Sequence, residues 1–223
     1  MCASTIREFV DNSVDPHVRG FLHVPQTPNS QALVLTHGAG GNAQAPLLRS
    51  LADAFAESGL TVLRCDLPYR QVRSFGPPGP GDAAHDRAGL RNALAALRKM
   101  ASGRLFLGGH SYGGRQSSML CAEEPSLAAA LLLLSYPLHP PRKPDQQRTQ
   151  HLPDLHTPTL FVHGTRDPFG STAELEQALK MIPAKTKLLP IEGAGHDLGF
   201  KGKAKKEELP RGILTAFEEF LTG

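Results

Sequence analysis

Short apolar runs recur along the chain and alternate with longer segments in which apolar residues return every three or four positions. Each run is nearly continuous and ends near Gly, Pro, Asn or Asp, which is typical of strands buried on both faces of a parallel sheet. We therefore predict core strands over Ala32–Thr36, Thr61–Cys65, Arg104–Leu107, Ala129–Ser135, Thr159–Val162 and Lys187–Ile191.

The intervening segments have the spacing of amphipathic helices. Leu90, Leu94 and Leu97, for example, recur at i, i+4 and i+7, as on the apolar face of a helix. Because strands and helices alternate, right-handed crossovers would give a mostly parallel α/β sheet covered by helices on both faces. The predicted helices are Pro46–Ser58, Asp82–Met100, Gly114–Glu124, Ala173–Met181 and Lys205–Leu221.

The N-terminal segment and two proline-rich stretches depart from this alternation. Arg7–Val10 and Gly20–Pro25 are expected to pair antiparallel at one edge of the sheet. Pro68–Asp82 and Pro137–Pro158 are too short and too polar for a lid domain, so we expect a site that is open to solvent on one side. The 223 residues fit one domain, residues 1–223, because single cores extend to roughly 250 residues.

Composition and charge narrow the classes of function. No apolar run approaches the roughly 20 residues of a membrane span, and the first residues lack the features of a secretory signal, so we expect a cytoplasmic protein without membrane contact. The net charge of +3 includes one dense cluster, which indicates a solvated helix start rather than a nucleic-acid surface. This cluster is Lys201, Lys203, Lys205 and Lys206.

We expect neither a metal nor a cofactor. The three cysteines are scattered and have no Cys-x-x-Cys spacing, which is typical of reduced thiols. The ten histidines form no His-Glu-x-x-His motif or Cys/His cluster of the kind that binds zinc. The glycine-rich segment His37–Asn42 lacks the Gly-Lys-Ser/Thr end of a phosphate-binding loop, so nucleotide binding is not expected either.

The motif Gly109-His110-Ser111-Tyr112-Gly113 lies between a predicted strand and a predicted helix. This is the setting of a nucleophile elbow, in which a serine is exposed on a sharp turn. Small residues two positions before and after the serine allow strand and helix to approach closely. We therefore predict that Ser111 is a nucleophile and that His110 packs; the alternative is a glycine-rich turn with an incidental serine.

A serine nucleophile needs a base and a carboxylate that orients the base. Asp167 follows the strand Thr159–Val162, and His196 lies in a glycine-flanked loop after Lys187–Ile191. Both positions fall at the carboxyl edge of the predicted sheet, where functional loops gather. The alternatives are a turn or helix-cap role for Asp167 and a loop position without a role for His196.

Backbone N–H groups must also stabilise the negative charge that develops on the substrate oxygen. Tyr112 supplies one by its position, and the loop after Ala32–Thr36 is expected to supply the other, from Ala39 with Gly40 as the alternative.

The next predicted strand end carries two arginines. Arg70 and Arg73 could hold a carboxylate of the substrate, or they could simply be solvated. His139 is a further candidate for substrate binding.

Several motifs together resemble the small lidless α/β-hydrolases related to dienelactone hydrolase. They are His37-Gly-Ala-Gly-Gly, Gly109-His-Ser-Tyr-Gly-Gly, His163-Gly-Thr-Arg-Asp and Gly195-His196. Asp66-Leu-Pro-Tyr-Arg and Ser135-Tyr-Pro-Leu-His look like motifs of a predicted-hydrolase group that includes the testis-expressed proteins and a scaffold subunit of a chromatin acetyltransferase complex. The resemblance implies an α/β-hydrolase fold without a lid. Dienelactone hydrolases use a cysteine nucleophile where this chain has Ser111, which argues against that particular substrate.

The first functional hypothesis is therefore a serine hydrolase that cleaves a small ester, thioester or lactone through an acyl-enzyme. Its partner would be a small-molecule acyl substrate. A second hypothesis is a noncatalytic binding or scaffold protein that retains the fold, as the likeness to the chromatin subunit suggests. A third is acyl transfer by the same residues.

Overall fold

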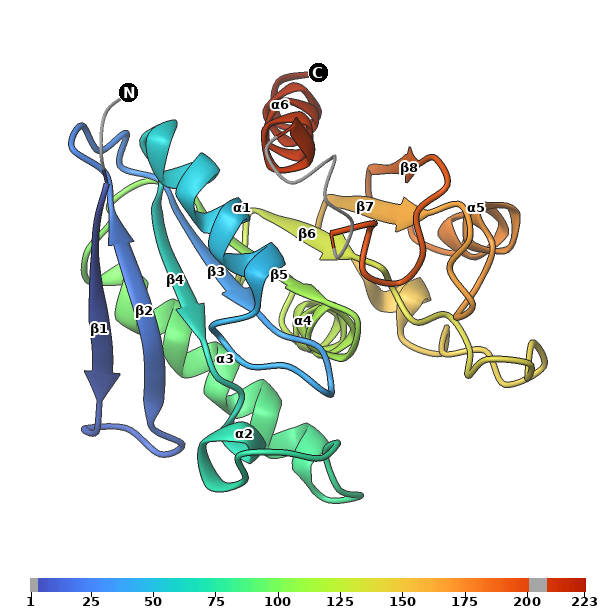
Figure 1. Cartoon of the computed structure of the whole chain (residues 1–223), viewed down its shortest axis with the longest axis horizontal. Coiled ribbons are helices and arrows are strands. Elements are labelled where there is room, and N and C mark those ends of the chain that lie inside the picture. The colour runs from blue at the N-terminus through green and yellow to red at the C-terminus, as the bar shows by residue number, and fades with distance from the viewer. Residues whose placement is uncertain (1–3, 201–207) are drawn as a thin grey trace.

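The centre of the protein is an eight-stranded sheet with the order β1-β2-β4-β3-β5-β6-β7-β8 (Figure 1). The structure is a computed structural model that describes residues 4–200 and 208–223. β1 and β2 are antiparallel to each other, and β2 is antiparallel to β4; all other neighbours are parallel. The strands are β1 (Thr5–Asp11), β2 (Val18–Val24), β3 (Ala32–Thr36), β4 (Thr61–Cys65), β5 (Leu105–His110), β6 (Ala130–Leu134), β7 (Thr159–Gly164) and β8 (Thr186–Ile191).

The predicted strands and the antiparallel pair at one edge are confirmed, but β8, which was predicted to be buried on both faces, lies at the other edge and its residues are only partly buried or exposed. β5 extends past its predicted end, because Gly108 and Gly109 continue the ladder with β6 and β3. A side-chain carbon on Gly108 would lie 2.6 Å from the carbonyl oxygen of Leu132. The glycine that marked a strand end in the sequence is therefore a strand residue whose neighbour leaves no room for a side chain.

Helices cover both faces of the sheet, as predicted (Figure 1). Apolar residues of α1 and α6 pack with Leu33 and Leu35 on one face, and those of α3, α4 and α5 pack with Ala32 and Val34 on the other. Alternate side chains of β3 thus contribute to two separate hydrophobic cores, one on each face of the sheet. The helices are α1 (Pro46–Glu57), α2 (Pro68–Val72), α3 (Asp82–Arg98), α4 (Tyr112–Glu123), α5 (Thr172–Leu179) and α6 (Glu208–Thr222).

The two proline-rich stretches interrupt the alternation of strands and helices, as predicted, but the first contains a helix that was not predicted. The proline-rich stretch after β4 contains the short helix α2, which begins with Pro68, a residue favoured in the first turn of a helix. Residues 135–158, between β6 and β7, contain only a 3-10 turn, η1 (Leu152–Asp154), because closely spaced prolines cannot donate helical hydrogen bonds. Neither described stretch forms a separate lid.

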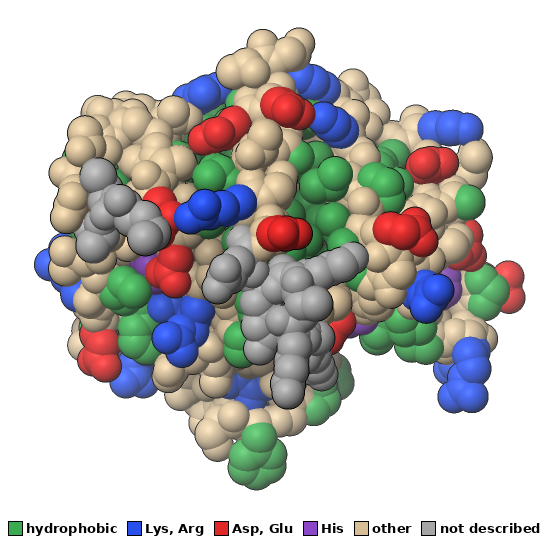
Figure 2. Space-filling view, turned by 45° about the horizontal axis from the view of Figure 1, so that its top comes forward, with side chains coloured by type: hydrophobic (Ala, Val, Ile, Leu, Met, Phe, Trp, Pro, Cys, Tyr) green, Lys and Arg blue, Asp and Glu red, His purple; other side chains and the backbone are tan. Residues whose placement is uncertain are grey.

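The predicted lysine cluster and the first residues of the last predicted helix lie outside the described residues, as does Cys2. On the face shown in Figure 2, acidic and basic side chains are intermingled. In the described ranges, no helix is long and apolar enough to cross a membrane. Cys65 and Cys121 are free and buried, and burial raises the pKa of both thiols to about 12, so they are protonated at neutral pH.

Candidate active site

Ser111 occupies a sharp turn between β5 and α4. Its backbone has φ 51° and ψ −116°, a conformation that L-residues rarely adopt and that persists only when surrounding contacts impose it. The Ser111 N–H donates to the Leu134 carbonyl at 2.8 Å, and its carbonyl accepts the Arg115 N–H at 2.9 Å. Strand β6 and helix α4 therefore hold the turn from both sides.

Two glycines make this turn possible. A side-chain carbon on Gly113 would lie 2.4 Å from the carbonyl oxygen of His37, and one on Gly109 would lie 2.8 Å from the Gly113 backbone. Strand, turn and helix are thus in direct backbone contact. The sequence motif is explained by this close approach.

The structure brings the three predicted side chains together at the turn. The Ser111 hydroxyl donates to His196 Nε2 at 2.8 Å, and His196 Nδ1–H donates to the Asp167 carboxylate oxygens at 2.8 and 3.0 Å. The three residues follow β5, β7 and β8, and the Asp167 side chain is fully buried. This direction of hydrogen bonding leaves the lone pair of Nε2 facing the serine.

The ring of His196 packs against two other rings. It stacks on Phe169 with centroids 4.2 Å apart and lies 5.1 Å from His110. His110 Nε2–H donates to the His196 carbonyl at 2.8 Å, and burial lowers the pKa of His110 to about 4, so His110 is neutral at neutral pH. His110 packs, as expected. Phe169 was not predicted, and its sequence signal is its place two residues after Asp167. The Phe169 N–H donates to the Asp167 carboxylate at 2.9 Å.

The loop after β3 lies against the same turn. A side-chain carbon on Gly38 would lie 3.3 Å from Ser111 Cβ and 2.8 Å from His110 Nδ1. In the described part of the chain, the N–H groups of Ala39 and Gly40, the two predicted donors of this loop, make no hydrogen bond. Tyr112 is the first residue of α4, so its N–H belongs to those that have no partner within the helix. Donors without internal partners thus occur on both sides of Ser111.

Arg70 anchors this loop instead of facing a substrate. Its Nε donates to the Gly41 carbonyl at 2.8 Å and its Nη2 to the Ala39 carbonyl at 3.0 Å. Further bonds reach the carbonyls of Arg73 and Gly76 at 3.0 and 2.7 Å, and the residue is 7% exposed. The expectation that Arg70 binds a substrate carboxylate is corrected accordingly, because its N–H groups already serve backbone carbonyls.

Arg73 and His139 are also engaged with protein groups. Arg73 pairs with Asp82 and lies 5.7 Å over the Tyr69 ring. His139 is buried; its Nδ1–H donates to the Pro140 carbonyl at 2.9 Å. A substrate would have to compete with Asp82 for Arg73, whereas His139 Nε2 is buried and has no hydrogen-bond partner among the described residues.

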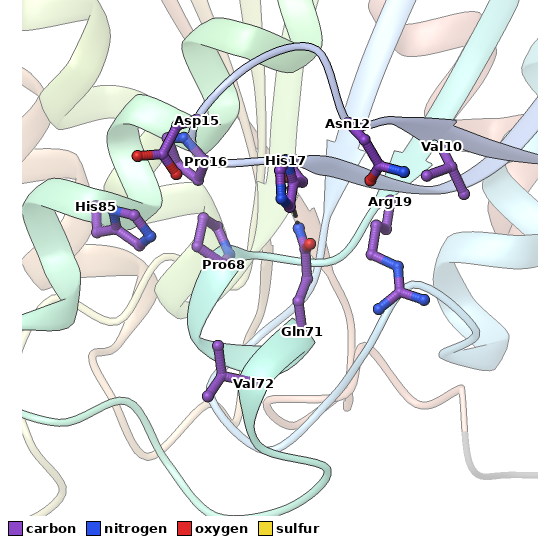
Figure 3. Close-up of a pocket in the computed structure, with 10 residues that line it drawn as sticks. All are labelled: Val10, Asn12, Asp15, Pro16, His17, Arg19, Pro68, Gln71, Val72 and His85. Carbon is purple, nitrogen blue, oxygen red and sulfur yellow. Dashed lines mark hydrogen bonds between the residues drawn. The ribbon is translucent and has the colours of Figure 1, made fainter.

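A hollow of about 350 Å³ lies between the β1–β2 turn and α2 (Figure 3). Asp15, His17, Arg19, Gln71 and His85 are among its lining residues, and Ser111 and its hydrogen-bonded partners are not. The hollow is therefore distinct from the candidate active site. Among the residues that the structure describes, no group of three or more His, Cys, Asp or Glu side chains could hold a metal ion.

Comparison with known proteins agrees with this fold. Residues 29–218 match the family model described as an alpha/beta hydrolase domain. The chain belongs to the α/β hydrolase family. A polyketide synthase of Burkholderia thailandensis, ThaQ, is 50% identical to this α/β hydrolase over 48 residues, which are 22% of this chain and 2% of that protein.

Solved structures resemble this α/β hydrolase over almost its whole length. Dienelactone hydrolase from Anabaena variabilis has a TM-score of 0.77 and 21% identity over 98% of each chain. An alpha-beta serine hydrolase homologue from Coxiella burnetii has a TM-score of 0.72 and 19% identity over 94% of this chain and 96% of that chain. A serine hydrolase without a lid from Xanthomonas campestris has a TM-score of 0.65 and 17% identity over 99% and 96%. The predicted lidless α/β-hydrolase fold is confirmed; the likeness to the testis-expressed group stays a prediction.

Proposed function

We propose that this α/β hydrolase is a serine hydrolase that cleaves a small ester, thioester or lactone through an acyl-enzyme on Ser111. The observation that carries the proposal is the continuous hydrogen-bond chain from Asp167 through His196 Nδ1 and Nε2 to the Ser111 hydroxyl, with distances of 2.8 Å at both ends. A base held in this way can accept the serine proton as the hydroxyl attacks a carbonyl.

The proposed reaction has two halves. Ser111 Oγ attacks the carbonyl carbon while His196 Nε2 takes the hydroxyl proton; the tetrahedral intermediate then collapses, and His196 returns the proton to the leaving alcohol or thiol. A water molecule repeats the sequence on the acyl-enzyme and releases the acid. Asp167 keeps the Nδ1 proton in place and stabilises the charged ring in both halves.

The negative charge on the carbonyl oxygen would be held by the N–H groups of Tyr112 and Ala39, with Gly40 as the alternative to Ala39. Each such donor contributes about 3 kcal/mol to catalysis in well-studied cases. The position of Tyr112 at the start of α4 adds the partial positive charge of the helix N-terminus.

Reaction with a fluorophosphonate probe, read by intact mass, tests the proposal. We expect one adduct on the wild-type protein and none on Ser111→Ala. We also expect turnover of p-nitrophenyl acetate, with kcat lowered about 10⁴-fold or more in Ser111→Ala and His196→Asn. Ser117→Ala is the matched control, since Ser117 lies in α4 and its hydroxyl donates to the Gly113 carbonyl; it should still be labelled.

The alternatives give different outcomes. No adduct on the wild-type protein would favour a noncatalytic scaffold, and an adduct that survives Ser111→Ala would place the nucleophile elsewhere. Transfer of the acyl group to an added alcohol in preference to water would indicate an acyltransferase.

A further inference from the structure

Asp86 of α3 is a buried acid that the reaction proposed above does not use. The residue is fully buried, and within the described ranges no cation lies within ion-pair distance of its carboxylate. Burial raises the pKa of Asp86, whereas hydrogen bonds from Tyr112 and Tyr69 oppose that rise. A carboxylate in such a place is costly unless its hydrogen bonds are well made, so its two partners indicate what it does.

One oxygen of Asp86 holds the residue after the nucleophile. The Tyr112 hydroxyl donates to Asp86 Oδ2 at 2.8 Å. The N–H of this same Tyr112 is one of the two donors proposed for the oxyanion hole. The bond therefore ties the first residue of α4 to a residue near the start of the adjacent helix α3.

The other oxygen holds the helix that anchors the second donor. Asp86 Oδ1 accepts the Tyr69 N–H at 3.1 Å, and the Tyr69 hydroxyl donates to the Ala39 carbonyl at 2.8 Å. Figure 1 shows α2, which carries Tyr69, beyond the ends of β3 and β4 and beside α3. The rings of Tyr69 and Tyr112 also meet edge to face, with centroids 5.9 Å apart.

Anchoring the carbonyls of this loop also aims its N–H groups. The Gly38 carbonyl accepts the Nδ1–H of His37 at 2.9 Å and lies 3.4 Å from the Tyr69 hydroxyl. The Gly38 carbonyl and the Ala39 N–H belong to one planar trans peptide, so they point in opposite directions. With the carbonyl fixed on the Tyr69 side, the N–H is directed away from it.

We propose that Asp86 is a positioning residue that fixes the two proposed oxyanion donors relative to each other. It holds Tyr112 through its hydroxyl and Ala39 through Tyr69. The inference rests on the proposed function and extends it to a residue that touches neither substrate nor Ser111. A rigid pair of donors needs no reorganisation as charge develops, which is how such donors accelerate a reaction. Substrate binding in the ground state depends less on their alignment.

The test compares three variants that each disrupt one or more of the hydrogen bonds that connect Asp86 to the two donors. Asp86→Asn keeps the shape of the side chain but replaces one acceptor with a donor, Tyr112→Phe removes the bond to Oδ2, and Tyr69→Phe removes the bond to Ala39. We expect each to lower kcat for p-nitrophenyl acetate by about 10-fold while KM changes less than about twofold. Binding of a trifluoromethyl ketone, which forms an alkoxide on Ser111, should weaken in parallel with kcat.

A double-mutant cycle separates positioning from general damage. Asp86→Asn combined with Tyr112→Phe should lose little more kcat than the stronger single variant, because both remove the same bond. Asp53→Asn is the matched control: its carboxyl, on α1 and paired with His23 at 3.1 Å, also has a pKa raised by burial. We expect its kcat to stay within twofold of wild type.

The outcomes distinguish the two proposals. An active wild-type enzyme whose folded Asp86→Asn variant keeps its kcat and its affinity for the ketone would overturn the positioning role alone. A rise in KM without loss of kcat would do the same, since it indicates a binding role. A wild-type protein that is neither labelled by fluorophosphonate nor active would overturn the proposed function and this inference with it.

Discussion

His196 depends on neighbours that contribute no chemistry of their own. Its ring stacks on Phe169 and packs against His110, and its carbonyl accepts a hydrogen bond from the latter. Asp167 fixes the hydrogen on Nδ1 but leaves the ring free to swing about that bond. The stack on Phe169 supplies the missing restraint, so the position of Nε2 depends on an apolar contact.

Phe169→Ala should therefore impair the base without removing it. We expect kcat/KM for p-nitrophenyl acetate to fall about 10-fold, because a loosely held catalytic group reaches its productive geometry less often. Phe169→Leu should lose less. Phe75→Ala is the control, because Phe75 is 84% exposed. Unchanged kcat/KM in Phe169→Ala would show that Asp167 orients the ring unaided.

The site residues differ in how far the sequence reveals them. Ser111, Asp167 and His196 each follow a predicted strand within a few residues of a glycine, and their order in the chain matches that of a serine nucleophile, its acid and its base, so they could be predicted. Asp86 could not, because its proposed role depends on contacts between helices that no local periodicity reports, and the sequence signal for Phe169 is limited to its place two residues after Asp167. The contacts of Arg70 could not be predicted for the same reason: its partners are backbone carbonyls, which carry no sequence signal.

At the scale of elements, most of the fold could be predicted, because β3 to β7 are apolar enough to be read as buried strands; β8 was predicted as a strand but is only partly buried or exposed. The helix α2 was missed because five residues are too few for a 3.6-residue period to show. It matters out of proportion to its length, since Tyr69 and Arg70 reach the loop after β3 from it.

Glycines in α4 and α6 should respond in opposite ways to a methyl group. Gly113→Ala would bring the new carbon to 2.4 Å from the His37 carbonyl oxygen, and we expect a loss of about 1–3 kcal/mol in the free energy of unfolding. At Gly212 in α6 the same carbon meets nothing within 4 Å, so Gly212→Ala should gain about 0.5–1 kcal/mol from helix propensity. Urea unfolding measures both; a stable Gly113→Ala variant would contradict the close packing described here.

At the scale of the whole molecule, three histidines that are buried or partly buried are neutral at neutral pH. Burial lowers the pKa of His23, His110 and His151 from 6.5 to about 4. Between those values the unfolded chain binds protons that the native chain does not, so stability falls as the pH is lowered from 6.5 toward 4. Asp53 and Asp86, whose pKa values are raised by burial, act with the opposite sign and reduce the slope at the acidic end.

We therefore expect the free energy of unfolding to decline between pH 7 and pH 5, with each fully shifted histidine contributing up to about 1.4 kcal/mol per pH unit. Urea unfolding at pH 7, 6 and 5 measures the slope. His110→Gln, which keeps an N–H donor, should make the slope shallower, and His85→Gln at an exposed position should leave it unchanged. An equal slope in all three proteins would exclude His110 as a source of the acid sensitivity.

Among the strands that the structure describes, β8 lies at an edge and pairs with β7 alone, and its residues are only partly buried or exposed. His196, the proposed base, lies in the loop after this strand, whereas Ser111 follows the central strand β5. Edge strands open more often than central strands, so His196 would leave its working position more often than Ser111. Each brief detachment of β8 would separate His196 from Ser111 while the rest of the sheet stays folded. The protein would then be inactive for part of the time although its fold is intact.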